Sequence, residues 1–96
     1  MKRGDLWKKI YIHSPDCAWR EIGGEVFIVS SKSGGVHMLN PVASFIWTHL
    51  DGNSTVAAIA SELEKEFDVE NSTINKDIPE FFDEMTKIGI VSEKQL

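Results

Sequence analysis

The side chains that most often carry out chemistry are few in this sequence and lie far apart. The three histidines stand alone at His13, His37 and His49, and there is one cysteine, Cys17. A structural zinc site needs clustered Cys and His at ligand spacings, and His13 with Cys17 is a single pair without a second one. A nucleophilic Cys17 would need a base and an orienting group, so the sequence favours a small, half-buried residue there. We therefore predict no metal, no cofactor and no catalytic residue, and an enzyme built on Cys17 is the alternative.

Two other kinds of site are also disfavoured. The carboxylates between residues 62 and 68 occupy the polar face of a predicted helix, whereas acid–base catalysis needs a pair with separated pKa values in an apolar cleft. The pairs Gly23–Gly24 and Gly34–Gly35 are predicted hairpin turns, and neither opens a helix as a phosphate-binding loop does. We therefore expect this chain to act by binding another molecule and not by catalysing a reaction.

Length and charge limit what could be bound. The chain has 96 residues and a net charge of −5; residues 1–40 carry six basic and four acidic side chains, and residues 41–96 carry four and eleven. Nucleic-acid binding needs a basic surface, and the predicted helices are acidic, so a winged-helix transcription regulator or a structural protein-interaction domain is kept only as an alternative. A single cysteine excludes an internal disulfide, and no apolar run reaches the length of a membrane span. The sequence thus predicts one domain located in the cytoplasm, with no nucleic-acid or membrane partner.

The first half of the chain has the patterns of β-strands. Residues 18–22 and 25–31 are rich in β-branched and aromatic side chains, and Gly23–Gly24 between them predicts a two-residue hairpin turn. Residues 35–39 form a third strand after a second turn, which gives a three-stranded antiparallel meander with the third strand at one edge. Residues 8–13 alternate weakly and could form a further strand.

The second half of the chain predicts three helices. Asn40–Pro41 is a strong start for the first, since Asn caps a helix and Pro suits its first position. Ser54 or Thr55 caps the second, and the third runs from about residue 73 to residue 88, with Pro79 predicted to kink it or to break it after Ile78. The predicted apolar stripe of the second helix is Val56, Ile59, Ala60, Leu63 and Phe67, and that of the third is Ile74, Ile78, Phe81, Phe82, Met85 and Ile88. The fold class is therefore α+β, a sheet followed by three helices.

The third strand is the first candidate binding element. An edge strand presents unpaired N–H and C=O groups, and residues 35–39 contain no charged side chain or proline that would discourage pairing. Such an edge can accept an extended peptide as an additional strand. Alternatively, residues 8–13 cover this edge or exchange between two copies, which predicts a monomer or a weak dimer through the N-terminal segment. The pattern leaves open which face of the strand is buried.

The third helix is the second candidate element. Its apolar side chains Ile78, Phe81, Phe82 and Met85 span a broad arc, so one side could face the core and another could line a groove. Asp77, Asp83 and Glu84 would give the groove a negative rim, which suits a basic or amphipathic peptide. On the pattern alone, the pair Phe81–Phe82 fits an ordinary core as well.

These motifs, taken in order over about residues 17–91, resemble the PqqD family of pyrroloquinoline quinone (PQQ) biosynthesis and the related RiPP recognition elements. The residues that carry the resemblance are Arg20, Gly24–Glu25, Val26–Val29, His37–Met38–Leu39–Asn40, Ile46–Trp47, Leu50–Asp51–Gly52, Thr55–Val56, Ile59–Ala60, Leu63, Asp77–Ile78, Phe81–Phe82, Met85 and Gly89–Ile90–Val91. The sequence departs from the family pattern at His37, where an aromatic residue is common, and at Pro79.

The resemblance implies a winged helix-turn-helix-like fold without catalytic activity of its own. It implies that the chain binds the leader segment of a ribosomally made precursor peptide and presents it to a radical S-adenosylmethionine (SAM) maturase, in PQQ biosynthesis or another peptide-modification pathway. By position, the peptide-binding residues are Val36, His37, Met38, Leu39, Asp77, Ile78, Phe81, Phe82 and Met85. The expected organisation is an N-terminal extension at residues 1–16, a peptide-binding domain at 17–92 and a frayed tail at 93–96.

Overall fold

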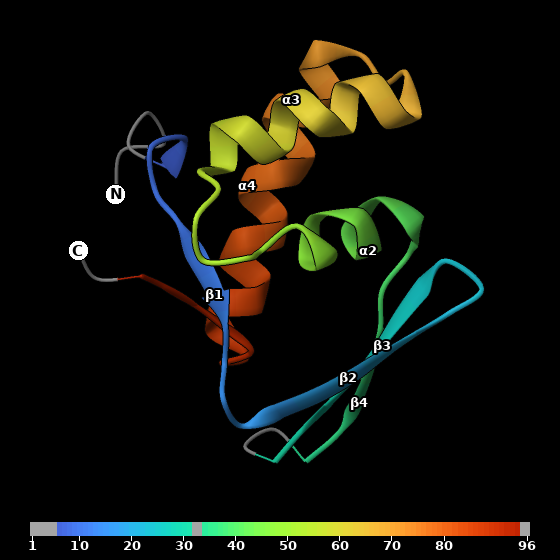
Figure 1. The fold of residues 1–96 in the computed structure, drawn as a ribbon, viewed down its shortest axis with the longest axis vertical. Coiled ribbons are helices and arrows are strands. Elements are labelled where there is room, and N and C mark those ends of the chain that lie inside the picture. The colour runs from blue at the N-terminus through green and yellow to red at the C-terminus, as the bar shows by residue number, and fades with distance from the viewer. Residues whose placement is uncertain (1–5, 32–33, 95–96) are drawn as a thin grey trace.

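The computed structural model describes residues 6–31 and 34–94. Its elements are β1 (Tyr11–His13), β2 (Cys17–Ile22), β3 (Glu25–Ser30), β4 (Val36–Met38), α2 (Pro41–Thr48), α3 (Val56–Phe67), α4 (Asn71–Lys87) and β5 (Val91–Glu93). Strands β2, β3 and β4 form an antiparallel sheet, and the three helices lie together on one side of it (Figure 1). The predicted α+β class and the order of its main elements are confirmed.

The sheet is an antiparallel meander whose register begins at a tight turn. Gly23 and Gly24 have φ angles of 60° and 84°, the left-handed region that a two-residue hairpin needs and that glycine adopts without strain. From this turn Ile22 lies opposite Glu25, and the ladder continues to Cys17 opposite Ser30. The predicted hairpin is confirmed, and β4 pairs with the other side of β3.

Helix α2 follows the sheet directly and is fixed to it by polar contacts. The Asn40 side chain accepts a hydrogen bond from the Ala43 N–H at 2.8 Å, which confirms the predicted N-cap. Ser44, which is buried, accepts a hydrogen bond from the Val26 N–H at 2.8 Å and donates one to the Leu39 carbonyl at 3.1 Å. These two bonds tie the first turn of α2 to β3 and to the chain that leaves β4.

The core lies between the helices and the inner face of the sheet. In α3, which Thr55 caps, the residues Val56, Ile59, Ala60 and Leu63 are buried as the stripe predicts. Helix α4 begins at Asn71, two residues earlier than predicted, and continues through the buried Pro79 to Lys87. A break after Ile78 is therefore excluded.

The N-terminal strand does not cover the three-stranded sheet. Strand β1 pairs antiparallel with β5 in a separate two-stranded ladder, with Tyr11 opposite Glu93 and His13 opposite Val91. The possibility that residues 8–13 cover the third strand is thus wrong for this structure. The Lys94 N–H donates to the Ile10 carbonyl at 2.7 Å, so the chain stays paired beyond Ser92, where fraying was expected, and residues 95–96 lie outside the described part.

Candidate functional site

Strand β4 uses only alternate residues to bond with β3. The Leu39 N–H donates to the Val26 carbonyl at 2.9 Å, and the Ser30 N–H donates to the Gly35 carbonyl at 3.3 Å. In an antiparallel pair, residues that exchange such bonds alternate with residues whose N–H and C=O groups point to the other side. The bonds at Leu39 and Gly35 mark two hydrogen-bonded positions of β4. His37 lies midway between them, so its N–H and C=O groups also point toward β3.

The backbone polar groups of Val36 and Met38 therefore point away from β3. These residues lie opposite Val29 and Phe27 in the register, at the positions that exchange no ladder bonds. In the described chain, β4 is the end strand of the order β2-β3-β4, and no strand pairs with it on the outer side. The edge thus presents the N–H and C=O groups of two residues, which point to where an additional strand would pair with β4.

The side chains of β4 show which face of this strand is buried, a point that the sequence pattern left open. Val36 and Met38 are 65% and 69% exposed and lie on the outer face, whereas His37 is half-buried on the inner face. Leu39, directly after the strand, is buried in the core. Because the two exposed side chains contribute little packing, β4 is held mainly by its ladder to β3, by the half-buried His37 and by the buried Leu39.

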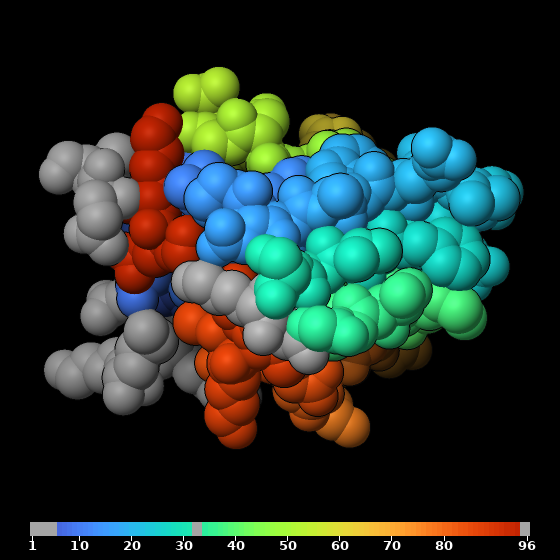
Figure 2. All heavy atoms as spheres, turned by 90° about the horizontal axis from the view of Figure 1, so that it is seen from below, coloured from blue at the N-terminus to red at the C-terminus, as the bar shows by residue number. Residues whose placement is uncertain are grey.

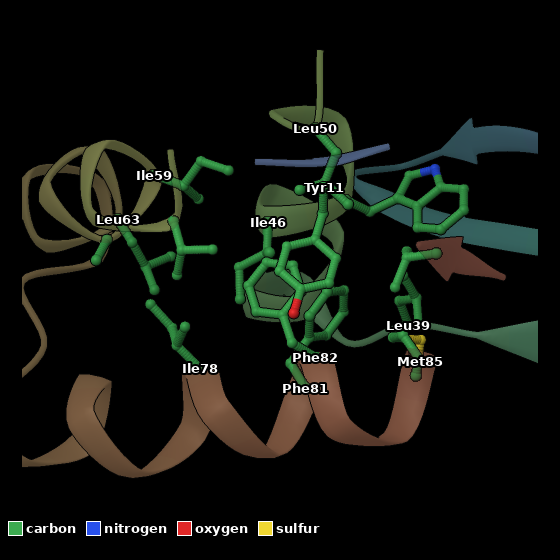
Figure 3. Close-up of a cluster of buried hydrophobic side chains, with 14 of the residues drawn as sticks. Tyr11, Leu39, Ile46, Leu50, Ile59, Leu63, Ile78, Phe81, Phe82 and Met85 are labelled. Carbon is green, nitrogen blue, oxygen red and sulfur yellow. The ribbon is translucent and has the colours of Figure 1, made fainter. Parts of the chain in front are cut away.

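A groove of about 430 Å³ lies beside the end of β4, between α2 and α4. It is lined by Met38, Leu39, Asn40, Val42, Ala43, Ile46, Asp77, Glu80, Phe81, Glu84 and Met85. Figure 3 shows Leu39 and Met85 close together, with Phe81 one turn earlier on α4. Five predicted site residues, Met38, Leu39, Asp77, Phe81 and Met85, therefore meet around one groove.

Four predicted residues are not part of the groove lining. Ile78 and Phe82 lie one helical turn apart on the face of α4 that packs into the core, and both are almost fully buried. Phe82 stacks on Tyr11 of β1, with ring centroids 4.4 Å apart, as Figure 3 shows. Val36 and His37 lie further back along β4. The broad arc of α4 is thus divided, with Phe81 and Met85 facing the groove and Ile78 and Phe82 facing the core.

The acidic rim of the groove contains Glu80 in place of the predicted Asp83. Asp77, Glu80 and Glu84 follow each other along one face of α4 and line the groove, whereas Asp83 does not. Asp83 lies near Tyr11 instead, where burial raises the pKa of the Tyr11 hydroxyl and the charges of Glu93 and Asp83 act in the same direction. Helical periodicity explains the exchange, because residue 80 lies within about 60° of both 77 and 84 around the helix axis, whereas residue 83 lies about 100° or more from both.

Sequence reasoning missed the side of the groove formed by α2. Val42, Ala43 and Ile46 were not among the predicted site residues, yet they line the groove as well as packing in or against the core. The signal was present, since Asn40–Pro41 starts a helix immediately after the edge strand and must place its first turn beside that edge.

The outer face of the sheet is unusually apolar. Ile22, Val29, Val36 and Met38 are each more than half exposed on this face. Figure 2 shows β2, β3 and β4 side by side across it, with no helix in front of them. The edge at β4 thus lies between an apolar outer face and the groove, and Met38 borders both.

The remaining titratable and nucleophilic residues lie elsewhere. His13 stacks on Trp47 with centroids 3.8 Å apart and donates from Nε2 to the Trp47 carbonyl at 2.8 Å, and burial lowers its pKa from 6.5. Cys17 is a half-buried free cysteine in β2. Within residues 6–31 and 34–94, no group of three His, Cys, Asp or Glu is arranged to hold a metal ion, and no helix is long and apolar enough to cross a membrane.

The open edge strand, the groove beside it and the sheet-then-helices order together define an α+β domain with a site suited to extended chains. A family model described as "Coenzyme PQQ synthesis protein D (PqqD)" matches residues 25–91, and the chain belongs to this family. The match spans β3 to the start of β5 and thus includes β4, α2 and α4, which form the groove.

A comparison with solved structures gives the same fold. The structure described as "TbiB1 in Complex with the TbiA(beta) Leader Peptide" is similar to this chain with a TM-score of 0.78 and 20% sequence identity, over 88% of this chain and 99% of that one. The search of curated proteins gives no match.

Proposed function

We propose that this protein binds the leader segment of a ribosomally made precursor peptide as an additional strand beside β4. The observation that carries the proposal is the outward direction of the Val36 and Met38 backbone groups, immediately beside an apolar groove. Membership of the PqqD family and the leader peptide bound in the similar structure support the same function.

The geometry gives each part of the site a role in such binding. Main-chain bonds to Val36 and Met38 would hold the peptide without reading its sequence. Side chains of a strand alternate between two faces, so every second peptide residue would point toward the groove between α2 and α4. Phe81 and Met85 offer apolar surface there, and the depth of the groove sets the register.

The proposed role ends with presentation of the peptide. In this proposal the chain is not an enzyme; it holds the leader while a radical SAM maturase in the cytoplasm modifies the rest of the precursor. The pathway makes PQQ or another modified peptide. The acidic surface of α4, with Asp77, Glu80 and Glu84 at the groove, argues against the alternative of a DNA-binding regulator, because phosphates would be repelled.

The test is a titration of the isotope-labelled protein with overlapping synthetic peptides that cover candidate precursors, chosen from the short reading frames near the gene for this chain. We expect one peptide, from the leader, to shift the amide signals of Gly35–Asn40 and Thr73–Ile88 most strongly. If the largest shifts fall on β2 or α3, the proposed site is wrong. Met38→Pro should remove the binding, because it deletes one of the outward N–H groups.

A further inference from the structure

We propose that the groove selects leader peptides in which Lys or Arg residues flank an apolar side chain. This inference rests on the proposed function and adds the chemistry of the ligand. The first observation is that the wall of α4 is acidic along the whole groove, at Asp77, Glu80 and Glu84. All three side chains are exposed, so a basic residue would pair with them at little desolvation cost.

Within the described chain, the groove itself contains no positive side chain opposite this wall. None of the lining residues is Lys or Arg, and Lys76 and Lys87 on the same helix lie outside the lining. The ion pairs recorded among the described residues, Lys9 with Glu93 and Lys65 with Glu62, do not involve the three rim carboxylates. The wall is thus a net negative surface beside a site for an extended chain, only partly balanced by Lys76 and Lys87 on the same helix, and its complement is a cationic peptide.

The rest of the groove is apolar and specifies a different kind of side chain. Its apolar lining residues are Met38, Leu39, Val42, Ala43, Ile46, Phe81 and Met85. Several of these are nearly buried already, so an aliphatic or aromatic side chain would complete the packing and exclude water. A peptide that fills the groove therefore needs an apolar residue as well as charge.

The spacing of the acidic residues on α4 predicts how the basic and apolar residues are arranged along the peptide. Along α4, Asp77 and Glu84 are separated by a helical rise of about 10.5 Å. For a peptide strand that runs along α4, residues that face the groove are about 6.7 Å apart, so the first and third of three such residues are about 13 Å apart. Long basic side chains can cover the difference of about 3 Å. The matching peptide is basic–x–apolar–x–basic, with these three residues facing the groove.

The test uses a phage-displayed library of random dodecapeptides selected on the full-length protein. Peptides whose binding is lost with Met38→Pro are retained, and we expect them to be enriched in Lys and Arg around an apolar residue at this spacing. Each exposed charge pair strengthens binding by up to about fivefold. Reversal of the two rim charges that the pattern uses, Asp77→Lys with Glu84→Lys, should therefore weaken a selected peptide by roughly tenfold or more in fluorescence anisotropy.

The matched control reverses two exposed acidic residues of α3, Glu64→Lys with Glu66→Lys, which changes the net charge equally and should leave the affinity within about twofold. Replacing the basic residues of the peptide by Glu should restore its binding to the rim-reversed protein. Edge-binding peptides without enrichment in Lys or Arg, or equal losses in both double variants, would overturn this inference and leave the proposed function intact. If every selected peptide still binds after Met38→Pro, the proposed function itself fails.

Discussion

Strands β1 and β4 are equally short, yet the molecule uses them in opposite ways. Each has three residues and one partner strand in the described chain. Tyr11 of β1 is buried against Phe82, and the ladder ends with an ion pair between Lys9 and Glu93, whose Nζ and Oε1 are 3.2 Å apart. In β4, by contrast, the side chains of residues 36 and 38 are mostly exposed and the outward backbone groups face an open edge.

The difference shows that burial of side chains, not pairing alone, decides what a short strand does. Strand β1 joins residues near both ends of the chain to the core, so changes in it should affect folding. In strand β4 only His37 is partly buried, and Val36 and Met38 are exposed, so changes in the outward groups of these two residues should affect binding and leave folding intact.

The largest effect on stability is expected in β1. Tyr11→Ala removes a buried aromatic ring that stacks on Phe82 and should lower the free energy of unfolding by about 3 kcal/mol, as measured by urea denaturation. Where the variant is still folded, its affinity for the leader peptide should match that of the wild type. A strong loss of affinity without a loss of stability would contradict the division between the two strands.

The second effect concerns binding at β4. Met38→Pro removes an N–H that points away from β3, a position where edge strands tolerate proline, so the free energy of unfolding should change by less than about 1 kcal/mol. The affinity for the leader peptide in a calorimetric titration should fall by at least about 30-fold. The matched control is His37→Pro, which removes an N–H directed at β3 and should destabilise the fold. Equal stability losses in the two variants would show that the edge is assigned wrongly.

A smaller effect is expected at the joint between the sheet and the groove. Ser44→Ala leaves the buried Val26 N–H without its partner and should lower the free energy of unfolding by about 1.5 kcal/mol in urea denaturation. Ser61→Ala, on the exposed side of α3, is the control and should change it by less than about 0.5 kcal/mol. An equally small effect at Ser44 would mean that α2 is held against the sheet by apolar packing alone.

The smallest effect is a pH dependence that arises in β1. Burial lowers the pKa of His13 from 6.5, so the unfolded chain binds a proton at a higher pH than the folded chain does. Stability should therefore be full above pH 6.5 and should decrease as the pH falls below that value. His13→Gln, which keeps a donor for the Trp47 carbonyl, should flatten the profile between pH 7 and pH 5.5 in thermal unfolding. An unchanged slope would assign the dependence to other groups.

Local signals of the sequence predicted most of the fold. The Gly23–Gly24 turn, the Asn40–Pro41 helix start and the stripe of α3 are each short-range patterns, and each is confirmed. The pairing of β1 with β5 joins segments about 80 residues apart, and strands of three residues carry too little pattern to reveal it.

The candidate site was predicted less completely for a related reason. The arc of apolar residues on α4 indicates two contact surfaces, but its division depends on the positions of β1 and α3, which no local pattern contains. Ile78 and Phe82 were therefore assigned to the groove although they belong to the core. The contribution of α2 was missed because Val42, Ala43 and Ile46 serve the core and the groove at once.

The central claim is that the outward groups of β4 receive an added strand. Hydrogen–deuterium exchange at single amides, measured by NMR with and without the leader peptide, tests it most directly. We predict that the Val36 and Met38 amides exchange rapidly in the free protein and become strongly protected in the complex, while the already bonded Leu39 amide changes little. Protection that appears elsewhere, with Val36 and Met38 still exchanging rapidly in the saturated complex, would contradict the account.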